Sequence, residues 1–250
     1  MGTSETAAGA VTPHVSIVIP AYNEARRIGD TIVKIEEFLH TFDASSELIV
    51  VDDGSSDDTA EIAERRRFPG LRVLRSGSNH GKGYSVRQGA LDARGEFVLF
   101  SDADLSAPIE ELPKLLAAAR RENADVVVGS RALDRSLIGL HQPRFRESGG
   151  ILFNLLVRVL LGLNIRDTQC GFKLFRRERA IDIFRRQTIP GFGFDPEILF
   201  LASRMNLKII EVPVRWNHAE GSKIHFLRDG TRMFFDLVRI RWNSIRGIYS

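Results

Sequence analysis

Two aspartates separated by one alanine follow an apolar run in the stretch GEFVLFSDADLSAP, residues 95–108. Side chains of an extended segment repeat every two residues, so Asp102 and Asp104 are expected to face the same side of a strand end. Two carboxylates this close require a cation, and hard oxygen ligands suit Mg²⁺ or Mn²⁺. The alternative is that the pair only caps a helix that starts near Pro108.

Apolar runs of strand length alternate with segments of helical periodicity over the first half of the chain. Strands are expected at residues 15–22, 47–51, 71–76, 96–104 and 125–131. Helices are expected at residues 25–42, 85–93 and 111–122, with a further helix capped by Asp57 or Asp58. This alternation, with strands that are apolar throughout, predicts an α/β fold whose mostly parallel, Rossmann-like sheet carries helices on both faces.

Each expected strand ends in a polar segment, and these segments are YNE, DDGS, NHGKG, DAD and SR in chain order. The carboxyl ends of parallel strands meet at one edge of a sheet, and ligands of such sheets bind there. One polar turn carries little information by itself. Five polar turns at one edge predict a binding site.

The segment NHGKG (79–83) could bind phosphate, because its glycines allow close approach of the backbone and Lys82 supplies a positive charge. The spacing from Gly77 to Lys82 is wrong for a P-loop, and no strand is followed by G-x-G-x-x-G. Both observations count against a nucleotide-hydrolysing enzyme and a dinucleotide dehydrogenase. Asp52 and Asp53 in the DDGS turn are either solvated turn residues or acceptors for a base N–H.

The composition is that of an ordinary globular protein of 250 residues, 43% hydrophobic and 27% charged. One large domain is expected over residues 15–225, preceded by a disordered tail over residues 1–14. That tail has neither the basic start nor the apolar run of a signal peptide. Cys170 is the single cysteine, which excludes an internal disulfide and a four-cysteine zinc site and favours a cytoplasmic location.

Charge is divided unevenly, with a net −5 over residues 1–150 and a net +8 over residues 151–250. The basic half requires an anionic partner. No spacing typical of nucleic-acid-binding motifs is present, so a membrane surface or a phosphorylated substrate is favoured over nucleic acid. Over residues 226–250, apolar residues are interleaved with arginines, which indicates either an interfacial helix at a membrane surface or an amphipathic helix of the core. No transmembrane helix is predicted.

The sequence resembles the inverting family 2 glycosyltransferases with a GT-A fold, which transfer a sugar from a nucleotide diphosphate. The motifs VSIVIPAYNE, ELIVVDDGSSDDT, NHGKG and SDADLSAP occur in the family's order over the first half of the chain. In the second half, GSRAL, IRDTQCGFKLFRR, GFGFDPEILFLA and EVPVRWNHAEGSK are similar to polyprenyl-phosphate hexosyltransferases, above all the dolichyl-phosphate glucosyltransferase branch. The resemblance implies transfer of a hexose, glucose from UDP-glucose in that branch, to a polyprenyl phosphate such as dolichyl or undecaprenyl phosphate.

The resemblance also implies roles for individual residues. The nucleotide pocket would be lined by Pro20, Tyr22, Glu24, Asp52 and Asp53, with Lys82 at the diphosphate and Asp102 and Asp104 at the nucleotide and the metal ion. The acceptor phosphate and the reacting centre would involve Arg131, Arg144, Ser148 and Gln169. Related mannosyltransferases often have a glutamine metal ligand where this chain has Ser106, so the coordination shell differs here or water completes it.

The nature of the acceptor decides whether a catalytic base is needed. A lipid phosphate is largely ionised at neutral pH, so its oxygen can attack the sugar without one. Asp195, in GFGFDPE, is the candidate base if one is needed, or it caps the following helix. Three alternatives stay open: a GDP-mannose-dependent mannosyltransferase, a soluble glycosyltransferase with a hydroxyl acceptor, and a sugar-nucleotide-binding protein without catalysis.

Overall fold

A seven-stranded sheet with the order β3-β2-β1-β4-β6-β5-β7 forms the centre of the protein. The structure, a computed structural model, describes residues 13–140, 144–218 and 226–249. Its strands are β1 (Val15–Ala21), β2 (Ser46–Asp52), β3 (Leu71–Arg75), β4 (Phe97–Ser101), β5 (Val126–Ser130), β6 (Phe172–Arg176) and β7 (Ile209–Pro213). Within the described residues, neighbouring strands pair in parallel except that β6 is antiparallel to β4 and β5. The expected mostly parallel sheet is confirmed.

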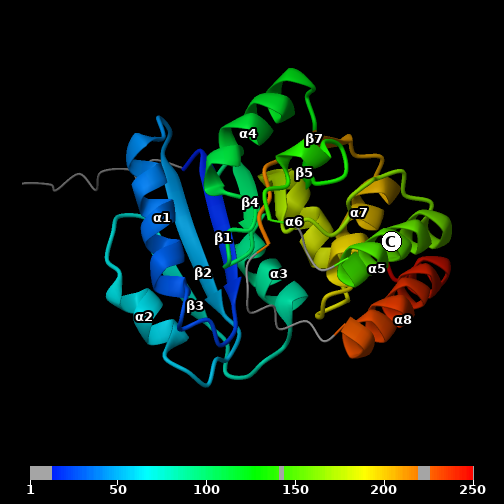
Figure 1. The fold of residues 1–250 in the computed structure, drawn as a ribbon, viewed down its shortest axis with the longest axis horizontal. Helices are drawn as coiled ribbons and strands as arrows, with labels where there is room; N and C mark the ends of the chain where they lie inside the picture. The colour runs from blue at the N-terminus through cyan, green and yellow to red at the C-terminus, as the bar shows by residue number, and fades with distance from the viewer. Residues whose placement is uncertain (1–12, 141–143, 219–225, 250) are drawn as a thin grey trace, which may run out of the picture.

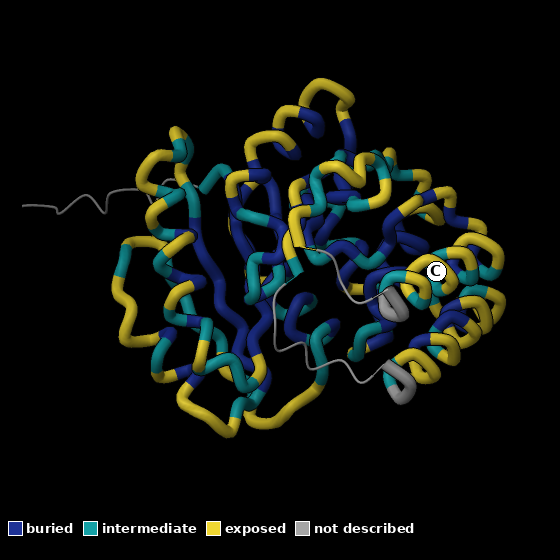
Figure 2. Tube along the Cα trace, viewed as in Figure 1, coloured by how far each residue is buried: buried dark blue, intermediate teal, exposed yellow. Residues whose placement is uncertain are grey.

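Helices cover both faces of this sheet (Figure 1). They are α1 (Ile28–Thr41), α2 (Thr59–Arg65), α3 (Lys82–Asp92), α4 (Leu112–Arg121), α5 (Arg144–Leu161), α6 (Arg177–Arg186), α7 (Phe194–Arg204) and α8 (Phe226–Ile245). Alternate residues of β1 face two separate cores, because Ile17 and Ile19 pack with α1 and α4 whereas Val18 packs with α3 and α5 to α8. Figure 2 shows the strands buried between these layers and the outer faces of α5 and α8 exposed.

Strand β6 brings a late segment of the chain to the edge where the earlier strands end. Because β6 runs antiparallel, its first residue, Phe172, lies opposite Ser101, the last residue of β4. The residues just before β6 therefore lie beside the turn that follows β4. The sequence pattern does not predict this reversal, because the alternation of strands and helices becomes irregular after residue 135.

Among the element boundaries that differ from those expected, two concern residues of the predicted site. Strand β4 ends at Ser101, so Asp102 and Asp104 lie on a turn and not on extended chain. Their proximity therefore comes from turn geometry and not from the two-residue repeat of a strand. Helix α3 begins at Lys82 and not at residue 85, which places this lysine at a helix N-terminus.

The described residues at each end of the chain contact the rest of the protein. Residues 1–12 of the expected tail lie outside the described residues, whereas the His14 ring nitrogen Nδ1 lies 3.0 Å from a carboxylate oxygen of Glu96. The C-terminal helix α8 packs against α5 and α7. Leu237 and Ile240 on its inner face are fully buried in the second core.

Candidate active site

The turn after β4 carries the two aspartates that the sequence predicts as a metal site. The Asp102 N–H donates to the Gly171 carbonyl at 3.1 Å, and Asp104 Oδ1 accepts from the Ser106 N–H at 2.9 Å. Leu105 has a φ of 47°, in the left-handed region that tight turns use. A Cβ at position 171 would lie 2.0 Å from Asp102 Oδ2, so only glycine leaves room for this carboxylate.

The electrostatics of this turn favour a bound cation. Burial and then the neighbouring Asp102 raise the pKa of the Asp104 carboxyl above its ordinary value. Across the described ranges, no group of three or more His, Cys, Asp or Glu side chains could hold a metal ion. Asp102 and Asp104 therefore fit an ion that takes its other ligands from phosphate oxygens and water, as Mg²⁺ and Mn²⁺ do.

Lys82 reaches the same aspartates from a different element. It follows Gly81, whose φ of 110° favours glycine, and it begins α3. Its Nζ lies 2.6 Å from Asp102 Oδ1. Burial opposes the charged form, but Asp102, Asp195 and Asp104 outweigh burial and raise the pKa of Lys82 to about 12. A permanent positive charge therefore lies at a helix N-terminus, where phosphate groups bind readily.

Asp53 holds the segment that carries this lysine. Its carboxylate accepts hydrogen bonds from Asn79 Nδ2 at 3.0 Å, from the His80 N–H at 3.0 Å and from the Gly81 N–H at 2.7 Å. Burial raises the pKa of Asp53, and the His80 and Gly81 amides oppose this shift. Asp53 thus shapes the predicted phosphate-binding turn, and its contact with a nucleotide stays a prediction.

Asp52 faces a hollow at the ends of β2 and β3. Its Oδ2 accepts from the Ser55 N–H at 3.2 Å, whereas Oδ1 is buried and has no hydrogen-bond partner in the described part of the chain. The hollow has a volume of about 390 Å³ and is lined by residues between 52 and 61 and between 75 and 77. A buried acceptor without a partner costs free energy, so this oxygen is available to a further donor, and the predicted contact with a base N–H stays a prediction.

The end of β1 lies at the same edge. Pro20 is buried within β1, and the chain leaves the strand through Tyr22, which is 38% exposed. Asn23 Oδ1 accepts from the Ser56 N–H at 2.8 Å and joins this end to the loop between β2 and α2. Glu24 follows and is half-buried. The residues predicted for the nucleotide pocket are therefore brought together along two adjacent strand ends.

Arg131, predicted to bind the acceptor phosphate, is held by a residue that the sequence analysis does not single out. Its Nε and Nη2 donate to the two carboxylate oxygens of Asp167, each at 2.7 Å. Burial opposes the charged form of Arg131, but Asp167 outweighs burial and raises its pKa. The guanidinium carbon lies 5.3 Å from the centre of the Trp216 ring. Nη1 has no hydrogen-bond partner among the residues that the structure describes, so this edge can receive an anion.

The loop that carries Asp167 is fixed from two sides. Asn154 of α5 donates through Nδ2 to the Ile165 and Arg166 carbonyls at 3.1 and 2.7 Å. Glu211 of β7 accepts from the Arg166 and Asp167 N–H groups at 2.9 and 3.0 Å. The polar residue that interrupts the apolar sequence of α5 therefore supports the site.

Asp195, the candidate base, forms a buried ion pair with Lys173 of β6. Lys173 is completely buried, and its Nζ donates to Asp195 Oδ1 at 2.6 Å and to the Cys170 carbonyl at 2.7 Å. Burial raises the pKa of Asp195, and Lys173 and Lys82 oppose this shift. Asp195 is only 4% exposed and is paired with Lys173 inside the protein, and its role as a base stays a prediction.

Comparison with known proteins decides the family. Residues 16–184 match the family model described as glycosyl transferase family 2. A dolichyl-phosphate beta-glucosyltransferase of Trichomonas vaginalis is 37% identical over 238 residues, which covers 91% of this chain and 70% of the relative. The corresponding protein of Dictyostelium discoideum is 34% identical over 250 residues and covers 94% of this chain and 76% of the relative. The chain belongs to glycosyl transferase family 2.

A solved structure shares the fold of this family 2 glycosyltransferase. Glucosyl-3-phosphoglycerate synthase from Mycobacterium tuberculosis, in complex with Mn²⁺, UDP-glucose and phosphoglyceric acid, matches with a TM-score of 0.64 and 23% identity. The match covers 92% of this chain and 80% of that chain. This likeness confirms the GT-A fold expected from the sequence. The family and the relatives confirm the expected glycosyltransferase activity.

Three other residues are predicted for the acceptor phosphate and the reacting centre of this glycosyltransferase. Ser148 is exposed on α5, and Gln169 is half-buried in the segment before β6. The side chain of Arg144, the first residue of α5, lies outside the described residues. The roles of these residues stay predictions.

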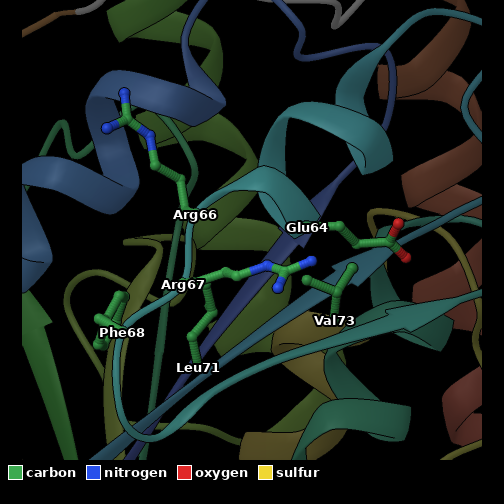
Figure 3. A pocket seen from close by; sticks show the side chains of 6 residues that line it. All are labelled: Glu64, Arg66, Arg67, Phe68, Leu71 and Val73. Carbon is green, nitrogen blue, oxygen red and sulfur yellow. The ribbon is translucent and has the colours of Figure 1, made fainter.

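A larger hollow lies away from the site, between the end of α2 and the edge strand β3 (Figure 3). It has a volume of about 480 Å³ and is lined by Glu64, Arg66, Arg67, Phe68, Leu71 and Val73. It contains none of the aspartates or lysines gathered at the strand ends. Size alone therefore does not locate the active site of this glycosyltransferase.

Proposed function

We propose that this glycosyltransferase transfers glucose from UDP-glucose to a polyprenyl phosphate of the dolichyl class, with inversion at the anomeric carbon. The observation that carries the proposal is that Asp102, Asp104 and Lys82 lie together at one edge of the sheet. Arg131 lies near enough to this group that Asp102 contributes to raising the pKa of Arg131. The relatives named dolichyl-phosphate beta-glucosyltransferases, at 37% and 34% identity, support the sugar and the acceptor. The neighbour bound to UDP-glucose supports the nucleotide.

The proposed reaction depends on cations more than on a base. An oxygen of the lipid phosphate attacks C1 of glucose, and the bond from C1 to the β-phosphate oxygen of UDP breaks, so UDP leaves with the bonding electrons. A phosphate monoester is largely ionised at neutral pH, so this oxygen needs no deprotonation. Arg131 binds and orients the attacking phosphate through its unpartnered edge. Lys82 stabilises the negative charge that develops on UDP.

A divalent metal ion fits the same site. Asp102 and Asp104 would hold it, and its chemical contribution would be positive charge beside the departing diphosphate. The Mn²⁺ in the neighbour that binds UDP-glucose supports a divalent ion here. Both Mg²⁺ and Mn²⁺ are compatible with oxygen ligands of this kind.

Donor binding tests the choice of sugar nucleotide. We expect UDP-glucose with Mn²⁺ to bind more tightly than GDP-mannose in titration calorimetry, and we expect Asp52→Asn to weaken UDP-glucose binding about ten-fold because a buried acceptor is altered. Asp43→Asn makes the same chemical change at an exposed position in the loop before β2, outside the hollow, so it serves as the control and should bind like the wild type. Preference for GDP-mannose would assign the chain to a mannosyl branch. Donor binding without product would indicate a binding protein.

The outer faces of α5 and α8 form a surface suited to lipid, which we call the amphipathic surface. Its exposed apolar residues are Ile151, Leu152, Leu155 and Val159 on α5, and Phe234, Phe235, Val238, Trp242, Ile245 and Ile248 on and just after α8. Its exposed arginines include Arg232, Arg239, Arg241 and Arg246. Aromatic and basic residues together bind anionic membrane interfaces, so we infer peripheral attachment at a cytoplasmic membrane surface. None of the described helices combines the length and apolar character needed to cross a membrane.

Vesicle binding tests the amphipathic surface. The wild type is expected to sediment with vesicles of phosphatidylcholine and phosphatidylserine, and Phe235→Ser combined with Trp242→Ser is expected to lower the bound fraction at least about ten-fold, because two exposed aromatic side chains are lost. Arg239→Gln with Arg246→Gln should weaken binding in a salt-dependent way. The matched control, Arg65→Gln with Arg67→Gln near α2, makes the same charge change and should bind normally. Equal binding by all variants would contradict the assignment.

A further inference from the structure

A buried glutamate on α7 joins separate parts of the chain. Glu197 is fully buried, and its Oε1 accepts from the Thr188 N–H at 2.9 Å, the Thr188 hydroxyl at 2.6 Å and the Tyr249 hydroxyl at 2.7 Å. Its Oε2 accepts from the Ile189 N–H at 2.8 Å. Burial and the Glu197 carboxylate raise the pKa of Tyr249 to about 12, so the hydroxyl remains a donor at neutral pH. Four donors thus converge on one carboxylate.

The segment before α7 supports the first turn of α3. Gln187 Nε2 donates to the Gly83 carbonyl at 2.9 Å, and the Tyr84 N–H donates to the Pro190 carbonyl at 3.0 Å. A Cβ at position 81 would lie 2.5 Å from the same Pro190 oxygen, which shows how closely the two segments approach. The segment therefore fixes the backbone on both sides of the lysine in that turn.

The chain beyond α8 folds back onto α7. Gly247 has a φ of 70°, a left-handed conformation that favours glycine and ends the helix. The ring of Tyr249 then lies 6.4 Å from that of Phe200, measured between centroids. Asn243 Nδ2 donates to the Thr188 hydroxyl at 3.1 Å. The end of α8 is therefore attached to the segment that supports α3.

We propose that Glu197 and Tyr249 are positioning residues for the donor, which hold the Lys82 turn in the geometry that receives the diphosphate. The inference rests on the proposed role of Lys82 in donor binding. One hydrogen bond joins Tyr249 to Glu197, three join Glu197 to Thr188 and Ile189, and the same segment holds the first turn of α3. The helix that carries the amphipathic surface thus also sets the affinity for the donor.

Tyr249→Phe tests this role, because it removes one hydroxyl and keeps the ring that packs on Phe200. We expect UDP-glucose affinity in the presence of Mn²⁺ to fall about three- to ten-fold, the effect of one lost hydrogen bond. We also expect the Tyr84 amide to exchange its hydrogen faster, because the turn opens more often. Titration calorimetry measures the affinity, and hydrogen–deuterium exchange measures the opening, with peptides from β1 as internal reference.

Two further variants separate positioning from general stability. Thr188→Val removes a second donor to Glu197 and is expected to weaken donor binding in the same way. Ile240→Val, on the buried face of α8, is expected to lower the melting temperature and to leave donor affinity unchanged. The proposal is overturned if Tyr249→Phe and Thr188→Val lower the melting temperature while UDP-glucose affinity and Tyr84 exchange stay at wild-type values. A wild type that binds no UDP-glucose would refute the proposed donor, whereas the exchange measurement would still decide whether this connection holds the turn.

Discussion

Replacing Asp104 with alanine is expected to abolish sugar transfer while the protein stays folded. Asp104 is half-buried beside Asp102, so its removal relieves repulsion between like charges, and Lys82 keeps its ion pair with Asp102. Transfer should fall by at least about a hundred-fold, because the ion that offsets charge on the departing diphosphate loses a ligand. Turnover with UDP-glucose, polyprenyl phosphate and Mn²⁺ measures the loss, and thermal unfolding verifies the fold.

A matched control exists in the turn after β5. Asp134 Oδ1 accepts from the Ser136 N–H at 3.0 Å, just as Asp104 Oδ1 accepts from the Ser106 N–H at 2.9 Å. Asp134→Ala therefore removes the same local hydrogen bond at an exposed position, and its activity should equal that of the wild type. Full wild-type activity in excess chelator would contradict the metal site.

Replacing the Arg131 guanidinium is expected to slow transfer more than removing the buried charges of Asp195 and Lys173. Losing one charge-assisted bond to a phosphate costs about ten- to a hundred-fold in rate. Arg131→Ala also leaves Asp167 buried without its partner, so Arg131→Lys is the better variant because it keeps the charge. Lysine cannot reproduce two parallel hydrogen bonds to one carboxylate, so the guanidinium-dependent alignment is lost. In steady-state kinetics, Arg131→Lys should show a higher KM for polyprenyl phosphate and a lower kcat than the wild type.

If Asp195 acts as a catalytic base, variants at Asp195 should lose more activity than variants at Arg131. Asp195→Asn alone is a poor test, because it leaves the completely buried Lys173 without its carboxylate. Combining it with Lys173→Met removes both charges together, and turnover should then stay within about ten-fold of the wild type, since a buried pair can often be replaced by neutral residues. A folded but inactive double variant, together with an active Arg131→Lys, would favour a hydroxyl acceptor with Asp195 as base.

Much of the donor half could be predicted from the sequence, because its signals are local. Apolar runs of strand length and the polar segment after each one place Asp52, Lys82 and Asp102 at one edge once the sheet is parallel. The hydrogen-bond partners of the individual side chains were less predictable. Asp53 accepts hydrogen bonds from the turn at residues 79–81, and these bonds depend on how two loops pack.

The acceptor half depends on pairings that no local pattern contains. The reversal of β6 brings Lys173 under Asp195, and the loop before it brings Asp167 to Arg131. Asp167 and Lys173 both lie within the motif IRDTQCGFKLFRR. Charged residues among apolar ones in such a motif indicate that the charges are buried and paired. The residues that pair with them, Arg131 and Asp195, are determined by tertiary contacts, so the sequence alone could not identify the pairs.

The position of β6 in the sheet also determines when the catalytic edge can form during synthesis. Strands β3, β2, β1 and β4 are consecutive neighbours in the sheet, and their pairing with one another needs no later strand. This part of the sheet can therefore assemble as soon as these four strands have been made. The other edge of β4 stays without a neighbour until residues 172–176 have left the ribosome, and the Asp102 N–H gains the Gly171 carbonyl only then. An open edge on an apolar strand is a template for aggregation. The nascent chain is therefore most vulnerable between the synthesis of β4 and that of β6, and the aspartates reach their final positions when that interval ends.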